Sequence, residues 1–223
     1  MKTEYNGITF ERPGHATVRI ESTDGTVIYI DPWSEVIDDA PGDADFVFVT
    51  HDDRDHYDPE AIRAVSSERT VVAAYEEVDT SDVSQDVTPL PYDGAATVGE
   101  IEVRTVPAYN RPDGEHLQDN GEPFHAKGEV IGLILLIDGT SIYVPSDTDF
   151  LDEHRNIDAD VVIPPIGGSY TMDRHEAAEM IESIGPDLVL PVHYNTDAVP
   201  GLDTDAKTFK KEIEAKGPRV VLF

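Results

Sequence analysis

An apolar strand that runs directly into a cluster of charged residues is the feature that most constrains this chain. Residues 46–56 read Phe-Val-Phe-Val-Thr-His-Asp-Asp-Arg-Asp-His. Burying such a strand is costly unless the charges at its end meet a cation, because unpaired charges lose their hydration. Alternate side chains of an extended segment project together, so His51, Asp53 and Asp55 can converge, with His56 at the turn into a helix. The segment favours a cation site over the alternative, a solvated acidic loop.

Three later segments bring further ligand-type side chains to the ends of strands. Asp147 follows the run 141–144, His193 follows the run 188–191, and His125 lies in a long polar stretch. The chain has no cysteine, which excludes thiolate ligands, iron–sulfur clusters and a Cys nucleophile. Nitrogen and oxygen donors from separate segments are what one or two divalent ions require, with positions left open for water.

Short runs rich in Val and Ile, each bounded by Gly, Pro or Asp, predict a series of strands. They cover residues 16–20, 27–30, 46–50, 70–74, 101–106, 131–137, 141–144, 161–164, 188–191 and 219–223. Capping and stop signals predict helices over residues 58–65, 173–184 and 204–216, and the stretch 109–127 is expected to be a loop. The expected fold class is α/β, a single domain over residues 1–223 with mostly antiparallel sheets in layers of helix, sheet, sheet and helix.

The acidic surplus describes the surface and the solvent rather than a reaction. Asp and Glu number 46 against 16 Lys and Arg, a formal net charge of −30, yet 39% of the residues are hydrophobic, which argues against disorder. Because about 1 M salt reduces the screening length to about 3 Å, the composition predicts a halophilic protein adapted to a salty cytoplasm. The alternative is an ordinary acidic protein.

The sequence shows no recognisable targeting or membrane-spanning segment. The first ten residues have neither a basic stretch followed by an apolar one nor a twin-Arg signal. No apolar run approaches the roughly 18 residues needed to span a bilayer. We therefore expect a cytoplasmic protein with no membrane partner. The negative surface argues against a nucleic-acid partner, and a homo-oligomer is left open.

The motifs resemble those of the metallo-β-lactamase superfamily. The segment His51-x-Asp53-x-Asp55-His56 is similar to its HxHxDH signature. Three further residues match its pattern at strand ends: Asp31, Asp147 and His193. Other segments resemble its lactonase-like branch of metal-dependent hydrolases, namely 14–16, 107–110, 124–128, 147–149, 165–168 and 191–194. The resemblance spans nearly the whole chain and implies a four-layer αββα sandwich of the metallo-β-lactamase type.

The resemblance also implies a ligand set for one or two divalent metal ions. One ion would take His51, Asp53 and His125. The other would take Asp55, His56 and His193. Asp147 would bridge the two, and zinc is the ion that such ligands most often bind in this family.

Two departures from the family pattern bear on the metal. The second His of the signature is Asp53 here, and the Gly that usually precedes the bridging Asp is Ser146. A carboxylate makes the first site harder, so Mn²⁺, Fe²⁺ or Mg²⁺ becomes more plausible beside Zn²⁺, and that site could also be weak or empty. His125 is one of three candidates for the third motif, because some relatives place this His at the position of Tyr109 or Asn110.

Supporting roles can be assigned to several neighbours of these ligands. Asp31 would orient a ligating histidine, while His15 would either support the site or be a buried His that bonds a turn. Lys127, Arg54 and Tyr194 lie close in sequence to the ligands and are candidates for binding an anionic group of a substrate. The remaining histidines are expected at the surface: His116, His154 and His175.

The function implied by the resemblance is metal-dependent hydrolysis of a small-molecule substrate. Metal-activated water would attack a lactone, ester or phosphodiester, and Asp55 would bind metal and orient the nucleophile. The chain has no GxSxG elbow or P-loop, which argues against a Ser hydrolase or a nucleotide kinase. One alternative is a metal-dependent ribonuclease or phosphodiesterase, although 223 residues leave no room for the usual substrate-clamping domain. The other is a non-catalytic metal-binding protein whose first site is degraded by Asp53.

Overall fold

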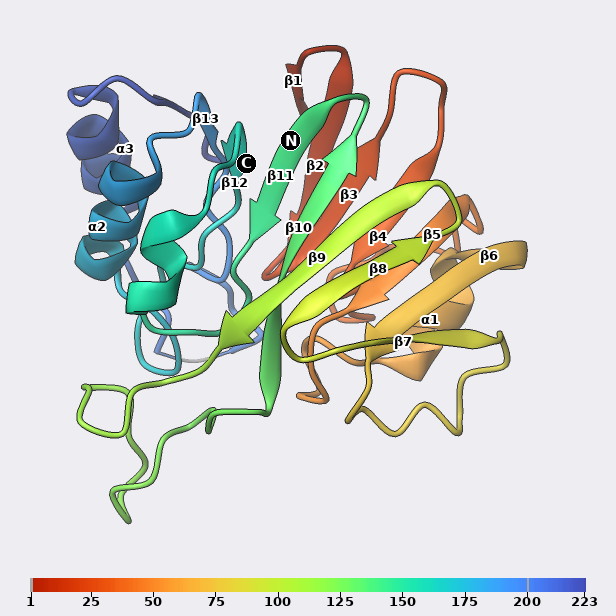
Figure 1. Ribbon diagram of the computed structural model, residues 1–223, viewed down its shortest axis with the longest axis horizontal. Helices are drawn as coiled ribbons and strands as arrows, with labels where there is room; N and C mark the ends of the chain where they lie inside the picture. The colour runs from red at the N-terminus through yellow and green to blue at the C-terminus, as the bar shows by residue number, and fades with distance from the viewer. Residues whose placement is uncertain (1, 200) are drawn as a thin grey trace.

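Two seven-stranded sheets form the body of the protein, and each is built from one half of the chain (Figure 1). The computed structural model describes residues 2–199 and 201–223. The strands of the first sheet are β1 (Lys2–Tyr5), β2 (Ile8–Gly14), β3 (Thr17–Glu21), β4 (Val27–Ile30), β5 (Ala44–Val49), β6 (Ser66–Tyr75) and β7 (Val87–Leu90). Those of the second sheet are β8 (Gly94–Val98), β9 (Ile101–Ala108), β10 (Val130–Ile137), β11 (Thr140–Val144), β12 (Val161–Val162), β13 (Leu188–Val189) and β14 (Arg219–Val220). In both sheets, neighbours in sequence are neighbours in space.

Both sheets begin with antiparallel pairings and continue with parallel ones. In the first sheet the pairing changes at β4, and in the second it changes at β11. The sheets expected to be mostly antiparallel are therefore mixed, with parallel pairings in one part of each sheet. The connections explain the change. Tight turns such as Asn6-Gly7 and Asp138-Gly139 join antiparallel strands, whereas longer crossovers, several of them helical, precede each parallel strand.

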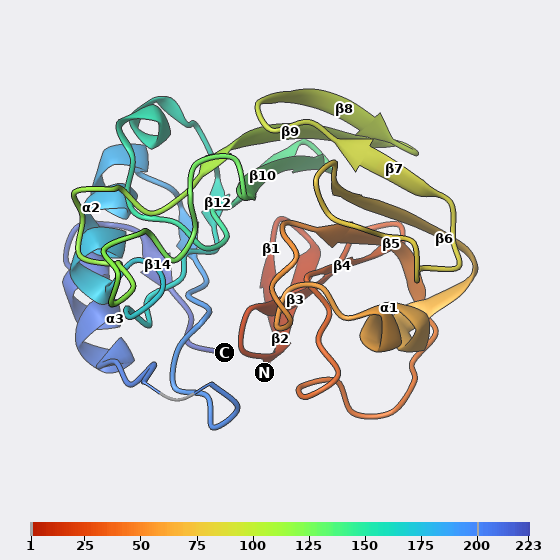
Figure 2. The same ribbon diagram turned by 90° about the horizontal axis from the view of Figure 1, so that it is seen from below.

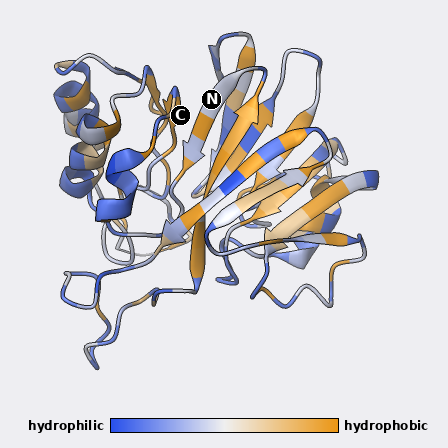
Figure 3. Ribbon diagram, in the orientation of Figure 1, coloured by the Kyte–Doolittle hydropathy of each residue, from blue (hydrophilic) through white to orange (hydrophobic). Residues whose placement is uncertain are grey.

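Helices cover the outer faces of the sheets, which gives the four layers expected from the sequence (Figure 2). The helix α1 (Pro59–Val65) lies outside the first sheet. Outside the second sheet lie α2 (Arg174–Ile184), α3 (Ala206–Glu214) and the 3₁₀ helix η1 (Asp152–Asn156). One hydrophobic cluster joins residues of both sheets, and another joins the second sheet to its helices. Figure 3 shows the same division, with hydrophobic strands inside and largely hydrophilic helices outside.

Local signals in the sequence set most of the helix ends. Asp58 accepts hydrogen bonds from the backbone at the start of α1, and Asp173 does the same for α2. Gly185 ends α2 in the left-handed conformation, with φ of 68°. The third helix is shorter than predicted, since Asp205 caps α3 and the helix ends at Glu214. No helix among the described residues is long and apolar enough to cross a membrane.

The strands deliver polar residues to one edge of the sandwich. Asp31 follows β4, His51 comes shortly after β5, Asp147 after β11, and His193 after β13. The strands β4 and β5 are parallel, as are β11, β12 and β13, so their carboxyl ends lie at a common edge. The loop between β9 and β10 extends from the body and returns to this edge with His125 (Figure 1).

Candidate metal centre

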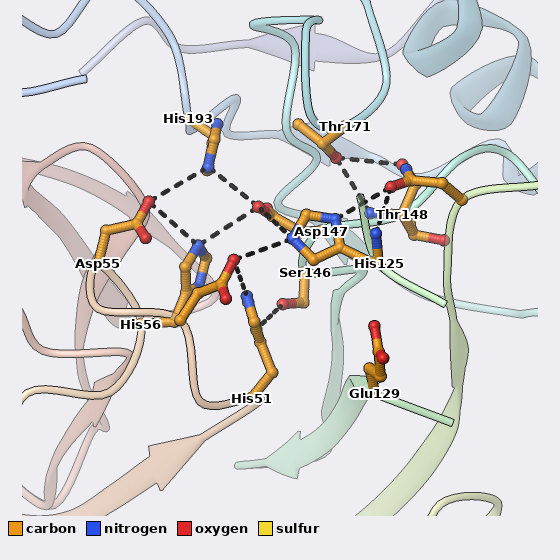
Figure 4. Close-up of polar contacts among 12 residues, drawn as sticks. His51, Asp55, His56, His125, Glu129, Ser146, Asp147, Thr148, Thr171 and His193 are labelled. Carbon is orange, nitrogen blue, oxygen red and sulfur yellow. Dashed lines mark hydrogen bonds and ion pairs between the residues drawn. The ribbon is translucent and has the colours of Figure 1, made fainter. Parts of the chain in front are cut away.

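The residues expected to hold metal lie together at this edge of the sandwich (Figure 4). They are His51, Asp53, Asp55, His56, His125, Asp147 and His193. The four histidines and Asp147 are buried, whereas the side chains of Asp53 and Asp55 keep 54% and 21% of their exposure. The structure brings the whole set together, and the role of each residue as a ligand stays a prediction.

One group of three side chains lies on the side of the long loop. His125 Nε2 is 3.1 Å from Asp53 Oδ2, and His51 Nε2 is 3.8 Å from the same oxygen. The ligand atoms of these three residues lie within 4.8 Å of one another. Asp53 therefore reaches the group from the signature position that usually carries histidine.

A second group surrounds Asp55. Its Oδ2 is 3.8 Å from His56 Nε2 and 3.7 Å from His193 Nε2. His15 joins this group, because its Nε2 lies 2.7 Å from the same oxygen. The sequence left His15 between a supporting and a structural role, and the contact with Asp55 is what the structure adds. The signal for His15 in the sequence was the resemblance of Gly14-His15-Ala16, at the end of β2, to the family pattern.

Asp147 lies between the two groups and faces both. Its Oδ2 is 3.1 Å from His193 Nε2 and 3.6 Å from His56 Nε2, on one side. On the other side it is 3.8 Å from His125 Nε2. A carboxylate in this position can serve two cations at once.

Several buried polar atoms at the centre have no hydrogen-bond partner among the described residues. They are Nε2 of His51, His56 and His193 and Oδ1 of Asp147. Leaving such atoms unpaired costs about 1–3 kcal/mol each, so a cluster of them favours a bound group that all of them can contact. Imidazole nitrogens and carboxylate oxygens are the donors that Zn²⁺, Mn²⁺ and Fe²⁺ accept. The donor set therefore fits divalent metal.

The Nδ1 atoms of two of these histidines face an outer network based on Asp31. This carboxylate lies 2.8 Å from His56 Nδ1, and it accepts hydrogen bonds from Thr50 Oγ1 at 2.7 Å and Thr50 N at 2.9 Å. His51 Nδ1 is 2.9 Å from Thr50 Oγ1, whose own proton goes to Asp31. Because an ionised carboxylate can only accept, both histidines carry a proton on Nδ1. Their Nε2 atoms are thereby directed to the centre.

A chain of polar contacts fixes the orientation of His125. Asn110 Oδ1 accepts hydrogen bonds from N and Nδ1 of His125, at 2.9 and 3.1 Å. Asn110 Nδ2 donates to Asp149 Oδ1 at 2.9 Å, and His116 Nδ1 lies 2.7 Å from the same oxygen. Asn110 therefore supports His125, and it is His125 that reaches the centre.

Two of the three histidines expected at the surface are buried, which corrects that expectation. His116 is 8% exposed and pairs with Asp149, while His154 is fully buried and its Nε2 lies 2.9 Å from the carbonyl oxygen of Pro107. His175 is exposed, as expected. A surface position was expected for His116 and His154 because the hydrogen-bond partners that satisfy them in the interior, Asp149 and the carbonyl oxygen of Pro107, lie far away in the sequence.

The charges at the centre favour a cation. Burial opposes protonation of His56 most strongly, but Asp147, Asp31 and Asp55 together raise its pKa to about 10. Burial also acts against ionisation of Asp147, and the surrounding histidines nevertheless hold its pKa well below the usual range. The hydrogen bond from His125 lowers the pKa of Asp53. A proton and a metal ion therefore compete for Nε2 of His56.

The three residues suggested for substrate binding lie in different surroundings. Lys127 is exposed, with its Nζ 5.2 Å from the ring centre of Tyr109. The Arg54 side chain is 84% exposed, and its Nη2 lies 3.5 Å from a carboxylate oxygen of Glu35. Tyr194 is buried beneath the guanidinium of Arg12, whose carbon is 4.3 Å from the ring centre. Substrate binding by Lys127, Arg54 and Tyr194 stays a prediction.

Strained backbone accompanies the centre. His15, Asp31, Ser146 and His193 all have positive φ, between 47° and 61°. Such conformations cost free energy in residues other than glycine and concentrate at functional sites. The family pattern usually has Gly before the Asp that corresponds to Asp147. The conformation of Ser146 explains this preference, because its φ of 61° is one that glycine adopts without strain. A Cβ at Gly167 would lie 2.2 Å from the carbonyl oxygen of His193, so this glycine allows the His193 segment to approach.

Two cavities flank the centre. One of about 540 Å³ borders His51, Asp53 and His125. The other, of about 320 Å³, borders Asp55 and includes Trp33, whose buried Nε1 has no partner among the described residues. A substrate placed over the centre would have room on either side.

Comparisons with known proteins agree with this geometry. A family model described as the beta-lactamase superfamily domain matches residues 9–193. The chain is 31% identical over 208 residues to a UPF0173 metal-dependent hydrolase of Methanosphaerula palustris, covering 91% of this chain and 89% of the relative. It is 32% identical over 218 residues to one of Archaeoglobus fulgidus, covering 92% and 90%. A solved metallo hydrolase of Ignicoccus hospitalis is 26% identical and aligns over 97% of this chain and 94% of its own, with a TM-score of 0.78.

Proposed function

We propose a reaction for this chain, which belongs to the beta-lactamase superfamily and is a metal-dependent hydrolase. Two divalent ions would serve the cleavage of a small-molecule lactone, ester or phosphodiester. One observation carries the proposal. Buried nitrogen and oxygen atoms that find no hydrogen-bond partner in the described part of the chain converge from separate segments on Asp147.

The two groups around Asp147 support an assignment of the ligands. His51, Asp53 and His125 would hold one ion, Asp55, His56 and His193 the other, and Asp147 would face both. The carboxylate of Asp53 adds an oxygen where the signature has nitrogen. With this carboxylate, the ion held by His51, Asp53 and His125 could be Mn²⁺, Fe²⁺ or Mg²⁺ as well as Zn²⁺, because oxygen ligands suit these harder ions better than histidine does.

The residues of the centre suit attack by water on a carbonyl or phosphoryl group. When bound, such ions lower the pKa of water from 15.7 towards about 7 and polarise the oxygen of the substrate. Asp55 accepts a hydrogen bond from the attacking water and orients it. His15 holds the Asp55 carboxylate in place through its Nε2, at 2.7 Å. Asp31 and Asn110 fix the imidazoles of His56 and His125 from outside.

Metal analysis joined to an activity screen tests the proposal. The purified protein, in molar KCl, is expected to carry two equivalents of metal and to hydrolyse at least one member of a panel of lactones, esters and phosphodiesters. His56→Ala and Asp147→Ala should each lose bound metal and activity, because each removes a buried ligand. His175→Ala, an exposed histidine on α2, is the matched control and should retain both. Full activity after either ligand substitution would contradict the assignment.

We also propose that the protein is halophilic and works in a salty cytoplasm. The net charge of −30 supports this, since charges of one sign repel unless salt screens them.

A further inference from the structure

The larger of the two cavities, of about 540 Å³, is bordered by the proposed ligands and by acidic and aromatic residues. His51 borders it with a buried Nε2 that has no partner among the described residues, so the cavity opens onto the reacting region. Its remaining wall comes from the residues after β6, from Tyr92 after β7, and from the loop before β10. Substrate that reaches the centre from this side must pass along that wall.

The described part of the wall carries several carboxylates and neither Lys nor Arg. Glu76 and Glu77 follow β6, and Asp52 and Glu129 also line the cavity, in addition to the proposed ligand Asp53. None of the described residues that line the cavity is Lys or Arg. A phosphate or carboxylate group would be repelled here, whereas a positively charged group would be attracted.

The two basic side chains suggested for substrate binding, Lys127 and Arg54, are engaged elsewhere. Lys127 Nζ lies over the ring of Tyr109 and 4.0 Å from a carboxylate oxygen of Glu153. Arg54 borders the smaller cavity on the far side of Asp55 and pairs with Glu35. Neither neutralises the wall of the larger cavity.

Aromatic rings complete the wall. Tyr75 and Tyr92 lie with their ring centres 6.2 Å apart, and Phe124 borders the same cavity. Tyr75 is 3% exposed and its hydroxyl donates to the carbonyl oxygen of Gly128, so its ring supports the wall from behind. The accessible ring surface comes from the half-buried Tyr92 and from Phe124, which is 36% exposed. Carboxylates together with fixed aromatic faces are the surroundings that bind ammonium groups, especially quaternary ones.

We propose that the substrate of this centre carries a positively charged ammonium group and that this group binds in the cavity lined by Glu76, Glu77 and the three aromatic rings. The inference rests on the proposed hydrolase function for the reaction itself, but the binding of the ammonium group does not depend on turnover. A polyanion such as RNA is excluded from this side by the same charges.

Binding of a matched pair of small molecules tests the proposal on the metal-loaded protein. Choline and its neutral isostere 3,3-dimethylbutan-1-ol differ in charge but hardly in shape. Calorimetry at about 1 M KCl, where the screening length is about 3 Å, removes the general attraction of an acidic surface. Choline should still bind about tenfold more tightly than the isostere, through cation–π and short-range charge contacts. Equal binding of the two, or binding of neither, would overturn the proposal.

Two double variants with the same change of charge test whether the preference for choline arises in the cavity. Glu76→Gln with Glu77→Gln should reduce the choline preference to about threefold or less, since two of the nearby charges are removed. Glu68→Gln with Glu102→Gln makes the same change of charge at exposed positions, one of them at the other end of β6, and should leave the preference intact. An equal loss in both double variants would show a surface effect and count against the cavity.

Turnover separates this inference from the function on which it rests. Acetylthiocholine and 3,3-dimethylbutyl thioacetate can be compared with a thiol reagent, which reacts only with product because the chain has no cysteine. We expect kcat/KM to be about tenfold higher for the ammonium ester. A choline preference without hydrolysis of any ester would contradict the hydrolase and support the cavity. Hydrolysis of both esters at equal rates would support the hydrolase and contradict the cavity.

Discussion

Asn110 supports the first group of proposed ligands from outside, through its hydrogen bonds with His125. It touches no proposed metal position, yet its Oδ1 accepts two hydrogen bonds from His125. Asn110→Ala should therefore weaken binding of the ion at His51, Asp53 and His125 by about 10–100-fold, as removal of an outer partner of a ligating histidine usually does. Calorimetric metal titration measures this. Asn120→Ala, an exposed asparagine of the same loop, is the control. Unchanged affinity in Asn110→Ala would show that the loop alone orients His125.

Ser146 combines strained backbone with a buried hydroxyl. Its Oγ lies 2.8 Å from Thr50 Oγ1, and its φ is 61°. Ser146→Ala keeps the strain and loses the hydrogen bond, so we expect the free energy of unfolding to fall by about 1 kcal/mol. Ser146→Gly loses the same bond but adopts positive φ without a Cβ penalty, so its cost should be smaller. Denaturant unfolding in molar KCl compares the two, and a glycine variant less stable than the alanine variant would contradict this explanation.

Several of the residues that meet at the centre could be identified from the sequence because they come after a predicted strand. The strand that ends at Val49 leads to His51, and the one that ends at Val144 leads to Asp147. The contact between His15 and Asp55 could not be predicted, since it joins residues whose separation depends on how β2 meets the segment after β5. The same holds for His116, whose partner Asp149 lies beyond two strands.

At the scale of elements, the loop between β9 and β10 should respond to pH. Burial opposes protonation of His116, but its hydrogen bond with Asp149 raises the pKa above the ordinary value. A raised pKa stabilises the folded loop fully below about pH 6.5 and loses that effect as pH rises through the folded value. Asp149 behaves in the opposite way: despite burial, the bond with His116 lowers its pKa, so its contribution is lost on acidification.

Hydrogen exchange across pH checks this expectation. Protection factors of the loop amides should be highest between about pH 4 and pH 6.5 and fall above that window. His116→Gln removes the titrating group and should give lower protection in the window with no fall above it. A loop whose protection in the unsubstituted protein rises above pH 7 would contradict the pairing.

Elements with strong local signals were predicted well, and those without were missed. The caps Asp58 and Asp173 placed α1 and α2 to within a residue. Four strands were not predicted because their side chains are partly polar: β1, β2, β7 and β8. Asn6-Gly7 is nevertheless a hairpin signal between the first two. The parallel pairings were not predicted for another reason. Whether two strands run parallel depends on the path of the long connection between them, and such connections show no periodic pattern in the sequence.

At the scale of the whole molecule, stability should depend on salt and metal together. The net charge of −30 repels itself at low ionic strength, so the unfolding temperature should rise as KCl is increased to molar concentrations. Chelation should lower it further, by roughly 5–15 °C for each ion present at 100–1,000 times its dissociation constant. The loss on chelation should be greater in low salt, because the carboxylates at the centre are then unscreened. Scanning calorimetry over a series of KCl concentrations, with and without chelator, measures both effects, and a salt-independent unfolding temperature would contradict the halophilic assignment.

The centre also joins parts of the chain that are far apart. His51, Asp53, Asp55 and His56 belong to the half that builds the first sheet, whereas His125, Asp147 and His193 belong to the half that builds the second. A bound ion would therefore act as a reversible cross-link between the halves, in a chain that has no cysteine with which to make a permanent one. Like a disulfide, such a link restricts the unfolded chain most when it closes a long loop. The ions would thus fasten the two sheets to each other as well as serve the reaction.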